Sequence, residues 1–278
     1  MRAGTIATLS PVNSQLSDDM QRRSRSFDAW ADDYDRYRPS YPDALFEHIG
    51  DRLAIGAEPI VADLGAGTGK ATLAMARLGW HVTAVEPGGP MLDALAARAA
   101  RDGLSVETRQ AQAEATGLPD ASFDLVTAAQ AFHWFDKPRV VAEMARIVRP
   151  GGGVAVFWNA RADDRSSFLA AYTDLVARYV PEEHVDRRDH GRRSTAPEDL
   201  AAGGWFIVDD RVEIAHELRF TPDEFIGYAF TASYIRLFLT DDSAAQLRAE
   251  LGNLLAEHAP GGSVTVPYDV DLYVGHRA

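Results

Sequence analysis

The sequence predicts an α/β fold with a seven-stranded, mostly parallel sheet, an antiparallel C-terminal strand and helical cap insertions. Short apolar runs alternate with helix-favouring runs between residues 60 and 158, which is typical of a parallel sheet with right-handed crossovers. The first apolar run ends in a glycine-rich turn, 65–69. Apolar and polar residues then alternate in 211–220 and 264–276, as in antiparallel strands with one solvated face.

The chain before the first strand is expected to contain a tail and two helices. We expect residues 1–25 to form a flexible tail and residues 26–278 to form one domain. A helical stretch opens the domain, with aromatic residues at helical spacing: Trp30, Tyr34 and Tyr37. Two prolines break this helix, and a second helix is expected over 43–53, capped by Asp43.

The first half of the domain is expected to hold five parallel strands separated by helices. The strands are placed at 60–64, 81–86, 105–109, 123–128 and 153–158. The intervening helices are placed at 70–78, 90–101 and 137–147. Ligands of such sheets bind beyond the carboxyl ends of the strands, so polar residues that follow these strand ends are candidates for the site.

The second half is expected to add a helical cap and two antiparallel strands. Helices are placed at 163–179, 222–239 and 241–258, and a polar loop at 181–197. The strands 211–220 and 264–276 complete the sheet as an antiparallel pair. We assign the segments 163–200 and 222–258 to the cap.

The turn 65–69 indicates a nucleoside-containing cofactor. Glycine has no Cβ, so the backbone there can come within contact distance of a ligand. Glu86 follows roughly 20 residues later, where ribose hydroxyls are held in such folds. A phosphate-binding P-loop would need Gly at Leu64 and Ser or Thr at Ala71, and a dinucleotide fingerprint would need Gly at Lys70. The sequence meets neither pattern.

An acid followed by three glycines at alternate positions, Asp63, Gly65, Gly67 and Gly69, resembles motif I of the class I S-adenosylmethionine-dependent methyltransferases. Four further segments resemble family motifs and stand in the family's order: 84–92, 112–119, 122–126 and 147–152. The residues in these motifs are most similar to those of the small-molecule, methyltransferase type 11-like branch. The resemblance covers 27–160 with specific motifs and implies a Rossmann-like sheet with S-adenosylmethionine as cofactor.

The resemblance also implies roles for individual residues. Glu86 is expected to accept from both ribose hydroxyls, with a helix cap as the alternative, and Met91 to pack on adenine, with core packing as the alternative. Asp63 is expected either to orient the turn or to bind the methionine amino group. Arg38 is expected to pair with the methionine carboxylate, with a surface ion pair as the alternative. The full cofactor set is Tyr34, Arg38, Asp63, Gly65, Ala66, Gly67, Glu86, Pro87, Met91, Gln112, Ala113 and Gln130.

Gln112 is a departure from the family pattern. The family usually has Asp at this position, where it accepts from the adenine amino group. A Gln carbonyl can accept the same bond, so adenine binding remains compatible with this sequence.

His133 and Tyr34 are the candidate catalytic residues. Imidazole titrates near neutrality, so His133 is a candidate general base, with packing in the pocket wall as the alternative. Tyr34 is expected to close over the site. Aromatic residues predict an acceptor wall, with ordinary core as the alternative: Trp134, Trp158, Tyr228 and Tyr234. No cluster of His and acid residues has metal-ligand spacing, so no metal is expected.

Composition excludes several function classes. A net charge of −13 opposes a nucleic-acid partner. No apolar run approaches the roughly 18 residues of a membrane span, and no secretory signal is recognisable, so a cytoplasmic protein without a membrane partner is expected. The chain has no cysteine, which removes thiolate chemistry and disulfides.

The sequence therefore predicts in-line methyl transfer to a carbon, nitrogen or oxygen atom of a small organic acceptor. Its Ala- and Arg-rich composition suggests natural-product biosynthesis as the setting. Two alternatives stay open. One is an enzyme that keeps the fold but runs another reaction, such as cyclisation; the other is a methyltransferase of nucleic acid or protein.

Overall fold

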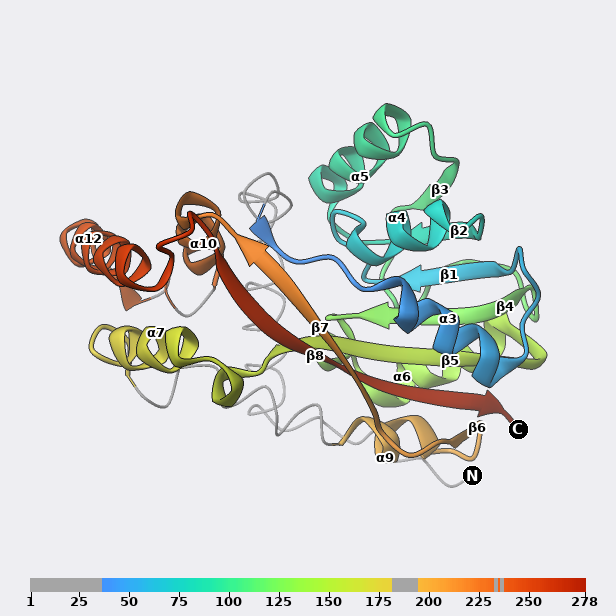
Figure 1. Cartoon of the computed structure of the whole chain (residues 1–278). Helices are drawn as coiled ribbons and strands as arrows, with labels where there is room; N and C mark the ends of the chain where they lie inside the picture. The colour runs from blue at the N-terminus through green and yellow to red at the C-terminus, as the bar shows by residue number, and fades with distance from the viewer. Residues whose placement is uncertain (1–36, 182–194, 233–234, 236–237) are drawn as a thin grey trace, which may run out of the picture.

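A twisted sheet of eight strands forms the centre of the protein (Figure 1). The computed structural model describes residues 37–181, 195–232, 235 and 238–278. The strands are β1 Ile60–Leu64, β2 His81–Val85, β3 Val106–Arg109, β4 Phe123–Ala129, β5 Val148–Arg161, β6 Phe206–Val208, β7 Val212–Phe220 and β8 Val264–Arg277. The helices are α3 Asp43–Leu53, α4 Lys70–Arg77, α5 Gly89–Arg101, α6 Lys137–Ile147, α7 Ser167–Ala177, α9 Ala196–Ala201, α10 Pro222–Phe230 and α12 Asp241–His258. The predicted tail and the aromatic helix up to residue 36 lie outside the described residues.

The strand order is β3-β2-β1-β4-β5-β8-β6, and β7 also pairs with β8. Strands β1 to β5 are parallel, and β8 runs antiparallel to β5. The α/β class, the mostly parallel sheet and the antiparallel C-terminal strand are therefore confirmed. All five parallel strands have their carboxyl ends at one edge, which is where the site is expected.

The strand count is one higher than predicted because the outer edge is divided into two strands. β6 pairs with the end of β8 through Ile207 and His276, and β7 pairs with its beginning, from Val212 opposite Leu272 onward. β6 is only three residues long, and periodicity gives no signal over so few positions.

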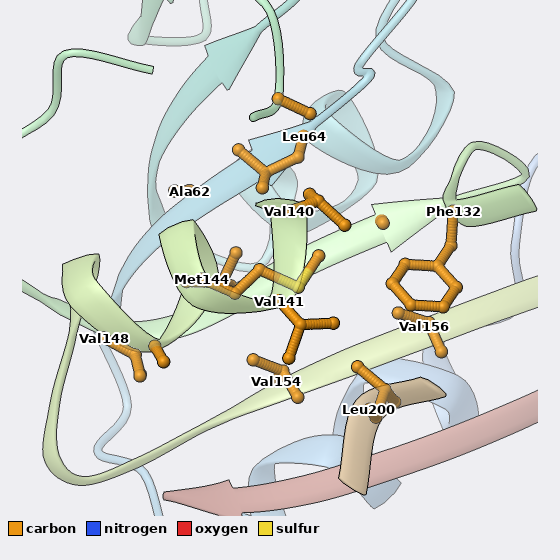
Figure 2. Close-up of a cluster of buried hydrophobic side chains, with 14 of the residues drawn as sticks. Ala62, Leu64, Phe132, Val140, Val141, Met144, Val148, Val154, Val156 and Leu200 are labelled. Atoms are coloured by element: carbon orange, nitrogen blue, oxygen red, sulfur yellow. The ribbon is translucent and has the colours of Figure 1, made fainter. Parts of the chain in front are cut away.

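Apolar side chains cover both faces of the sheet. On one face, α3 and α4 pack against β1, β5 and β8 around Phe46, Met75 and Phe157. On the other face, α6 and α9 cover β4 and β5, where Val141, Met144 and neighbouring aliphatic side chains interdigitate (Figure 2). The central strands β1 and β4 are thus buried on both sides, as is usual in parallel sheets, whereas the edge strand β3 is largely exposed.

A third apolar cluster lies beyond the carboxyl ends of β1 and β4, where α7, α10 and α12 gather (Figure 1). These helices pack around Phe225, which is completely buried, and on the amino-terminal half of β8. We call this layer the cap. α9 falls inside the segment 163–200 but packs against α6 and the sheet instead.

α10 is shorter than the helix expected over 222–239. Its last residue is Phe230, because the amide and the hydroxyl of Thr231 both donate to the carbonyl of Tyr228, at 3.0 and 2.6 Å. Such local bonds from Thr compete with continuation of a helix. Of the helices that the structure describes, none is both long enough and apolar enough to cross a membrane.

Candidate active site

The glycine turn connects β1 to α4 at the carboxyl edge of the sheet. The amides of Gly65 and Ala66 both donate to the carbonyl of Val85, at 2.8 and 3.1 Å, so the turn is tied to the end of β2. Gly65 has a φ of 68°, and a Cβ at this position would lie 2.7 Å from that of Ala131. Only glycine satisfies both the backbone angle and the close approach.

Glu86 lies against this turn. One of its carboxylate oxygens accepts from the amide of Gly67 at 3.0 Å, and the other accepts from Gly88 at 3.0 Å. The carboxylate is therefore shared between the turn after β1 and the loop before α5. The helix-cap alternative is not supported, because α5 begins at Gly89 with no side-chain cap.

Asp63, the last acid of β1 before the turn, is completely enclosed. Its two carboxylate oxygens accept from the hydroxyls of Thr72 and Thr127, at 2.6 and 2.8 Å. Burial raises its pKa to about 6, although these hydrogen bonds pull in the other direction. Asp63 thus ties β1 to α4 and β4, which favours the predicted role of orienting the turn.

The predicted adenine side of the site is formed by α5 and the loop after β3. The sulfur of Met91 would lie 3.9 Å from a Cβ on Gly67, so Met91 borders the turn. The carbonyl of Pro87 accepts from the side chain of Gln110 at 3.1 Å. Gln112 is exposed at the start of the loop, and Ala113 is buried.

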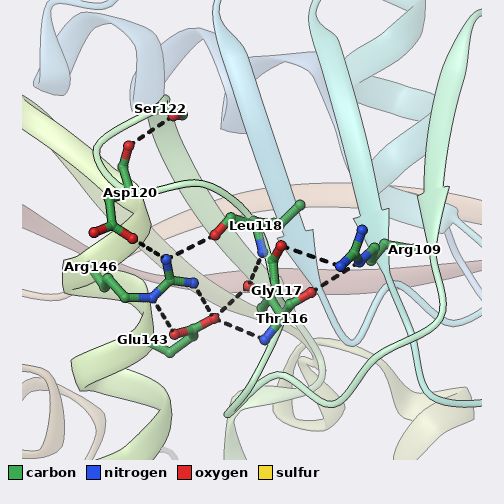
Figure 3. Close-up of polar contacts among 8 residues, drawn as sticks. All are labelled: Arg109, Thr116, Gly117, Leu118, Asp120, Ser122, Glu143 and Arg146. Atoms are coloured by element: carbon green, nitrogen blue, oxygen red, sulfur yellow. Dashed lines mark hydrogen bonds and ion pairs between the residues drawn. The ribbon is translucent and has the colours of Figure 1, made fainter.

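A polar network fixes that loop to α6 (Figure 3). Glu143 accepts from the amide and the hydroxyl of Thr116, at 2.8 and 2.5 Å, and from two nitrogens of Arg146, at 2.8 and 2.7 Å. Arg146 also bonds Asp120, and Arg109 donates to the Thr116 carbonyl at 3.1 Å. Partial burial would raise the pKa of Glu143, but the bonds from Arg146 and Thr116 outweigh it and lower the pKa to about 2.

The segment after β4 holds Gln130 and His133. Gln130 has a φ of 55°, unusual for a residue with a side chain, and donates to the carbonyls of Phe157 and Asn159 at 2.9 and 3.0 Å. His133 is buried, and its Nδ1 accepts from Nε1 of Trp158 at 3.1 Å. In the neutral ring the proton then lies on Nε2, so this arrangement argues against His133 as a general base and favours a packing role.

The predicted acceptor wall is spread over several layers. Trp158, on β5, is completely buried beside His133 and Tyr273, so it has no surface to offer an acceptor. Trp134 is half-buried beside His133, at a ring distance of 4.7 Å. Tyr228 lies in the cap on α10. Tyr34 and Tyr234 lie outside the described residues.

Arg38 lies next to the cap. Its Cζ is 5.4 Å from the centre of the Tyr228 ring, and its Nη2 donates to the Thr231 carbonyl at 3.4 Å. The described contacts thus link Arg38 to α10, and they include none with the glycine turn. A role on the methionine carboxylate stays a prediction.

The comparisons with known proteins agree with this fold. A methyltransferase domain profile matches residues 62–156, from β1 to β5. An uncharacterised methyltransferase of Mycobacterium tuberculosis is 34% identical over 88% of this chain and 93% of its own. The chain belongs to the class I methyltransferase family.

Further similarities extend over most of this methyltransferase. The solved structure of a protein of Anaeromyxobacter dehalogenans, assigned as a type II methyltransferase, superposes with a TM-score of 0.66 at 29% identity, over 86% of this chain and 98% of that one. The nocamycin O-methyltransferase of Saccharothrix syringae is 26% identical over 77% of this chain and 83% of its own. The likeness therefore includes the cap as well as the sheet.

The methyltransferase site fits a nucleoside cofactor that brings no phosphate to the turn. The Gly67 amide, which a P-loop would offer to a phosphate, donates to Glu86 instead, and a carboxylate repels phosphate. The hydrogen bonds from the amides of Gly67 and Gly88 use about two of the roughly four acceptor positions of the Glu86 carboxylate. The donor set thus suits S-adenosylmethionine.

Four polar residues near this site were missed by sequence reasoning. Thr68 is buried in the turn, and its hydroxyl forms no hydrogen bond with any residue that the structure describes. Asn159, Arg161 and Tyr268 come together only through the pairing of β5 with β8. Thr68 could have been found from its place between two motif glycines, but the other three have no local signal.

Proposed function

We propose that this methyltransferase moves the methyl group of S-adenosylmethionine to a small organic acceptor held between the strand ends and the cap. The observation that carries the proposal is the carboxylate of Glu86, held 3.0 Å from the Gly67 amide at the mouth of the glycine turn. A carboxylate fixed there recognises the two hydroxyls of a ribose. The name of the related nocamycin O-methyltransferase supports a small-molecule acceptor.

The cofactor, when bound, supplies an electrophilic methyl group on a sulfonium. The chain then contributes alignment more than proton transfer. Gln130 fixes the end of β4 against β5 through the Asn159 carbonyl, and the aromatic side chains of the cap keep water away from the reacting atoms. Holding acceptor and methyl at near-attack distance is a large part of the rate enhancement of such reactions. We place no proton transfer on His133, because its Nδ1 is occupied by Trp158.

Calorimetric titration with S-adenosylhomocysteine, with NAD⁺ and ATP as controls, tests the cofactor assignment. We expect micromolar binding of S-adenosylhomocysteine alone. Glu86→Gln keeps the size of the side chain but removes its charge, and should weaken binding at least tenfold, about 1.4 kcal/mol. The matched control is Glu107→Gln. Glu107 lies on β3 and accepts from the hydroxyl of Thr83 on β2, so this variant should bind S-adenosylhomocysteine as the wild type does.

Tighter binding of NAD⁺ or ATP would overturn the assignment. A second assay follows S-adenosylhomocysteine release with a panel of small acceptors. A protein that binds the cofactor yet releases no S-adenosylhomocysteine with any acceptor would point to the alternative of a non-methylating reaction on the same fold.

A further inference from the structure

A group of arginine and tyrosine side chains lies where the sheet meets the cap. Arg161, near the end of β5, stands directly opposite Tyr268 on β8. Arg38 and Tyr228 complete the group, since the guanidinium of Arg38 lies 5.4 Å from the Tyr228 ring centre. We call Arg38, Arg161, Tyr228 and Tyr268 the junction cluster.

Arg161 is held in a defined position. Only 8% of its side chain is exposed, and Nε and Nη2 pair with the two carboxylate oxygens of Asp163 at 3.1 and 3.2 Å. Its Cζ lies 5.0 Å from the centre of the Tyr172 ring. A guanidinium that is fixed and largely buried is suited to recognise an anion, because little side-chain freedom is lost on binding.

Tyr268 supplies a polar atom that the fold does not use. Its side chain is 1% exposed, and its hydroxyl makes no hydrogen bond of ordinary geometry with the residues that the structure describes. Burial and then the neighbouring Tyr228 raise the pKa of Tyr268 well above its usual range, whereas Arg161 and Arg38 act in the opposite direction. The phenol therefore stays protonated and remains a hydrogen-bond donor, within electrostatic reach of both arginines.

The junction cluster adjoins the place where the acceptor is expected. Asn159, on the same face of β5 as Arg161, accepts from Gln130 through its carbonyl at 3.0 Å. Its side chain donates to the carbonyl of Ser40 at 3.1 Å, close in sequence to Arg38. In Figure 1 the chain from residue 37 starts beside α10 and passes over the sheet to α3. Two hydrogen bonds thus connect the end of β4 to chain segments that carry Arg38 and Arg161.

We propose that the junction cluster binds a carboxylate of the acceptor, so that the substrate of this methyltransferase is a small organic acid. This inference rests on the proposed function and deepens it. The planar guanidinium of Arg38 matches a carboxylate, and the Tyr268 hydroxyl donates a further bond to it. Arg161, whose Nε and Nη2 are held by Asp163, adds positive charge beside the carboxylate. The contact of Arg38 with the Thr231 carbonyl, at 3.4 Å, is longer than an ordinary hydrogen bond; in this proposal its guanidinium leaves that carbonyl for the carboxylate of the acceptor, and it does not serve the methionine carboxylate of the cofactor.

The test uses the full-length protein saturated with S-adenosylhomocysteine and calorimetric titration with paired probes. The probes are succinate, citrate, benzoate and octanoate, each against its neutral amide. We expect at least one acid to bind at least tenfold more tightly than its amide. Saturation with S-adenosylhomocysteine is measured first, so a failure at that step counts against the proposed function and not against the carboxylate site.

Tyr268→Phe is the informative variant, because it removes a hydroxyl that makes no hydrogen bond of ordinary geometry with the described residues and whose neighbour is the hydroxyl of Tyr228. A purely structural role predicts no change, whereas we expect the acid to bind roughly tenfold more weakly, with S-adenosylhomocysteine affinity and melting temperature unchanged. Arg161→Gln should weaken the acid further. The matched controls are Tyr179→Phe and Arg178→Gln, a hydroxyl and a guanidinium of the cap that bond Glu250 instead.

Three results would overturn the carboxylate site in a protein that binds S-adenosylhomocysteine. The first is that none of the acids binds. The second is equal affinity for an acid and its amide. The third is an unchanged affinity for the acid in Tyr268→Phe.

Discussion

At the scale of single residues, Asp63 links pH to stability. Its pKa is raised to about 6 in the folded protein, chiefly by burial, against an ordinary value near 4 in the unfolded chain. A raised pKa means that the folded state holds the proton more tightly, so the contribution of Asp63 to stability is complete below about pH 4. It is lost as the pH rises through about 6.

Asp63→Asn should reveal this loss, because Asn keeps the shape but does not titrate. Between pH 5 and pH 7.5 we expect the stability of the wild type relative to the variant to fall by about 1 kcal/mol. Urea denaturation of both proteins at the two pH values gives the difference. A difference in unfolding free energy that does not depend on pH would show that Asp63 titrates normally.

A residue's role could be predicted from the sequence where the residue lies in a turn or at a strand end that its own neighbours in the chain define. Gly67 and Glu86 lie at a turn and at a strand end that the apolar runs locate, and a hydrogen bond joins them in the structure. Arg161 and Tyr268 are about a hundred residues apart, and only the β5–β8 register makes them neighbours. Whether Trp158 packs in the core or lines the acceptor site likewise depends on which face of β5 it occupies, and a run buried on both faces does not encode that face.

At the scale of elements, α10 approaches the chain at residue 37 through a glycine. A Cβ at Gly227 would lie 2.4 Å from the ring of Tyr37, whereas one at Gly252 in α12 would meet nothing within 4 Å. Ala is favoured over Gly in an open helix by about 0.5–1 kcal/mol. Replacement by Ala is therefore expected to change the stability in opposite directions at these two positions.

Gly252→Ala should stabilise the protein by about 0.5–1 kcal/mol, and Gly227→Ala should destabilise it, because α10 and Tyr37 must move apart. Thermal unfolding of the two variants beside the wild type measures both effects. Equal stabilisation by the two substitutions would show that α10 does not pack on Tyr37.

The loop after β3 depends on α6 in a comparable way. Arg146→Gln leaves Glu143 without its cation, and we expect a loss of about 2 kcal/mol at pH 7. This is below the range for a fully buried pair, because 35% of the Arg146 side chain is exposed. Chemical denaturation measures it, with Arg139→Gln on the exposed side of α6 as control. The pKa of Glu143 is lowered to about 2 in the folded protein. The stabilisation by its carboxylate is therefore complete above about pH 4.5 and is lost progressively as the pH falls towards about 2. A loss that persists undiminished at pH 3 would contradict this account.

Most elements could be predicted because their signal is local. The bounds of α6 match the expected 137–147, and the parallel strands match to within a few residues, apart from β5, which is longer at both ends. The exceptions have tertiary causes. No helix is predicted over α9, whose first two residues fall in the loop expected at 181–197. Ala196 and Leu200 are too few to form a pattern, and they are buried only by contact with the sheet layer.

At the scale of the whole molecule, the cap and the sheet share β8. Val264 and Val266 belong to the cap cluster, and Val270 and Leu272 to the cluster beneath α3. A continuous strand cannot lose one half of its pairing without weakening the other. We therefore expect both layers to unfold in one transition.

Phe225→Ala tests this coupling from within the cap. Removing a fully buried Phe costs about 3–5 kcal/mol, and the four tryptophans that the structure describes lie outside the cap helices: Trp80, Trp134, Trp158 and Trp205. Tryptophan fluorescence therefore reports on the rest of the protein, and far-UV circular dichroism reports on all helices. We expect both midpoints to shift equally. An early loss of helix with unchanged fluorescence would mean that the cap unfolds independently.

The position of β8 in the chain also has a consequence for synthesis on the ribosome. β5, β6 and β7 all use β8 as a partner in the described sheet, so these antiparallel pairings must wait until residues 264–277 have been translated. The parallel half can assemble earlier, with the outer edge of β5 unpaired while residues 162–263 are added, an interval on the order of 5–20 s. An open strand edge is a template for aggregation. The yield of folded protein is therefore expected to depend on chaperone supply and on translation speed over this stretch.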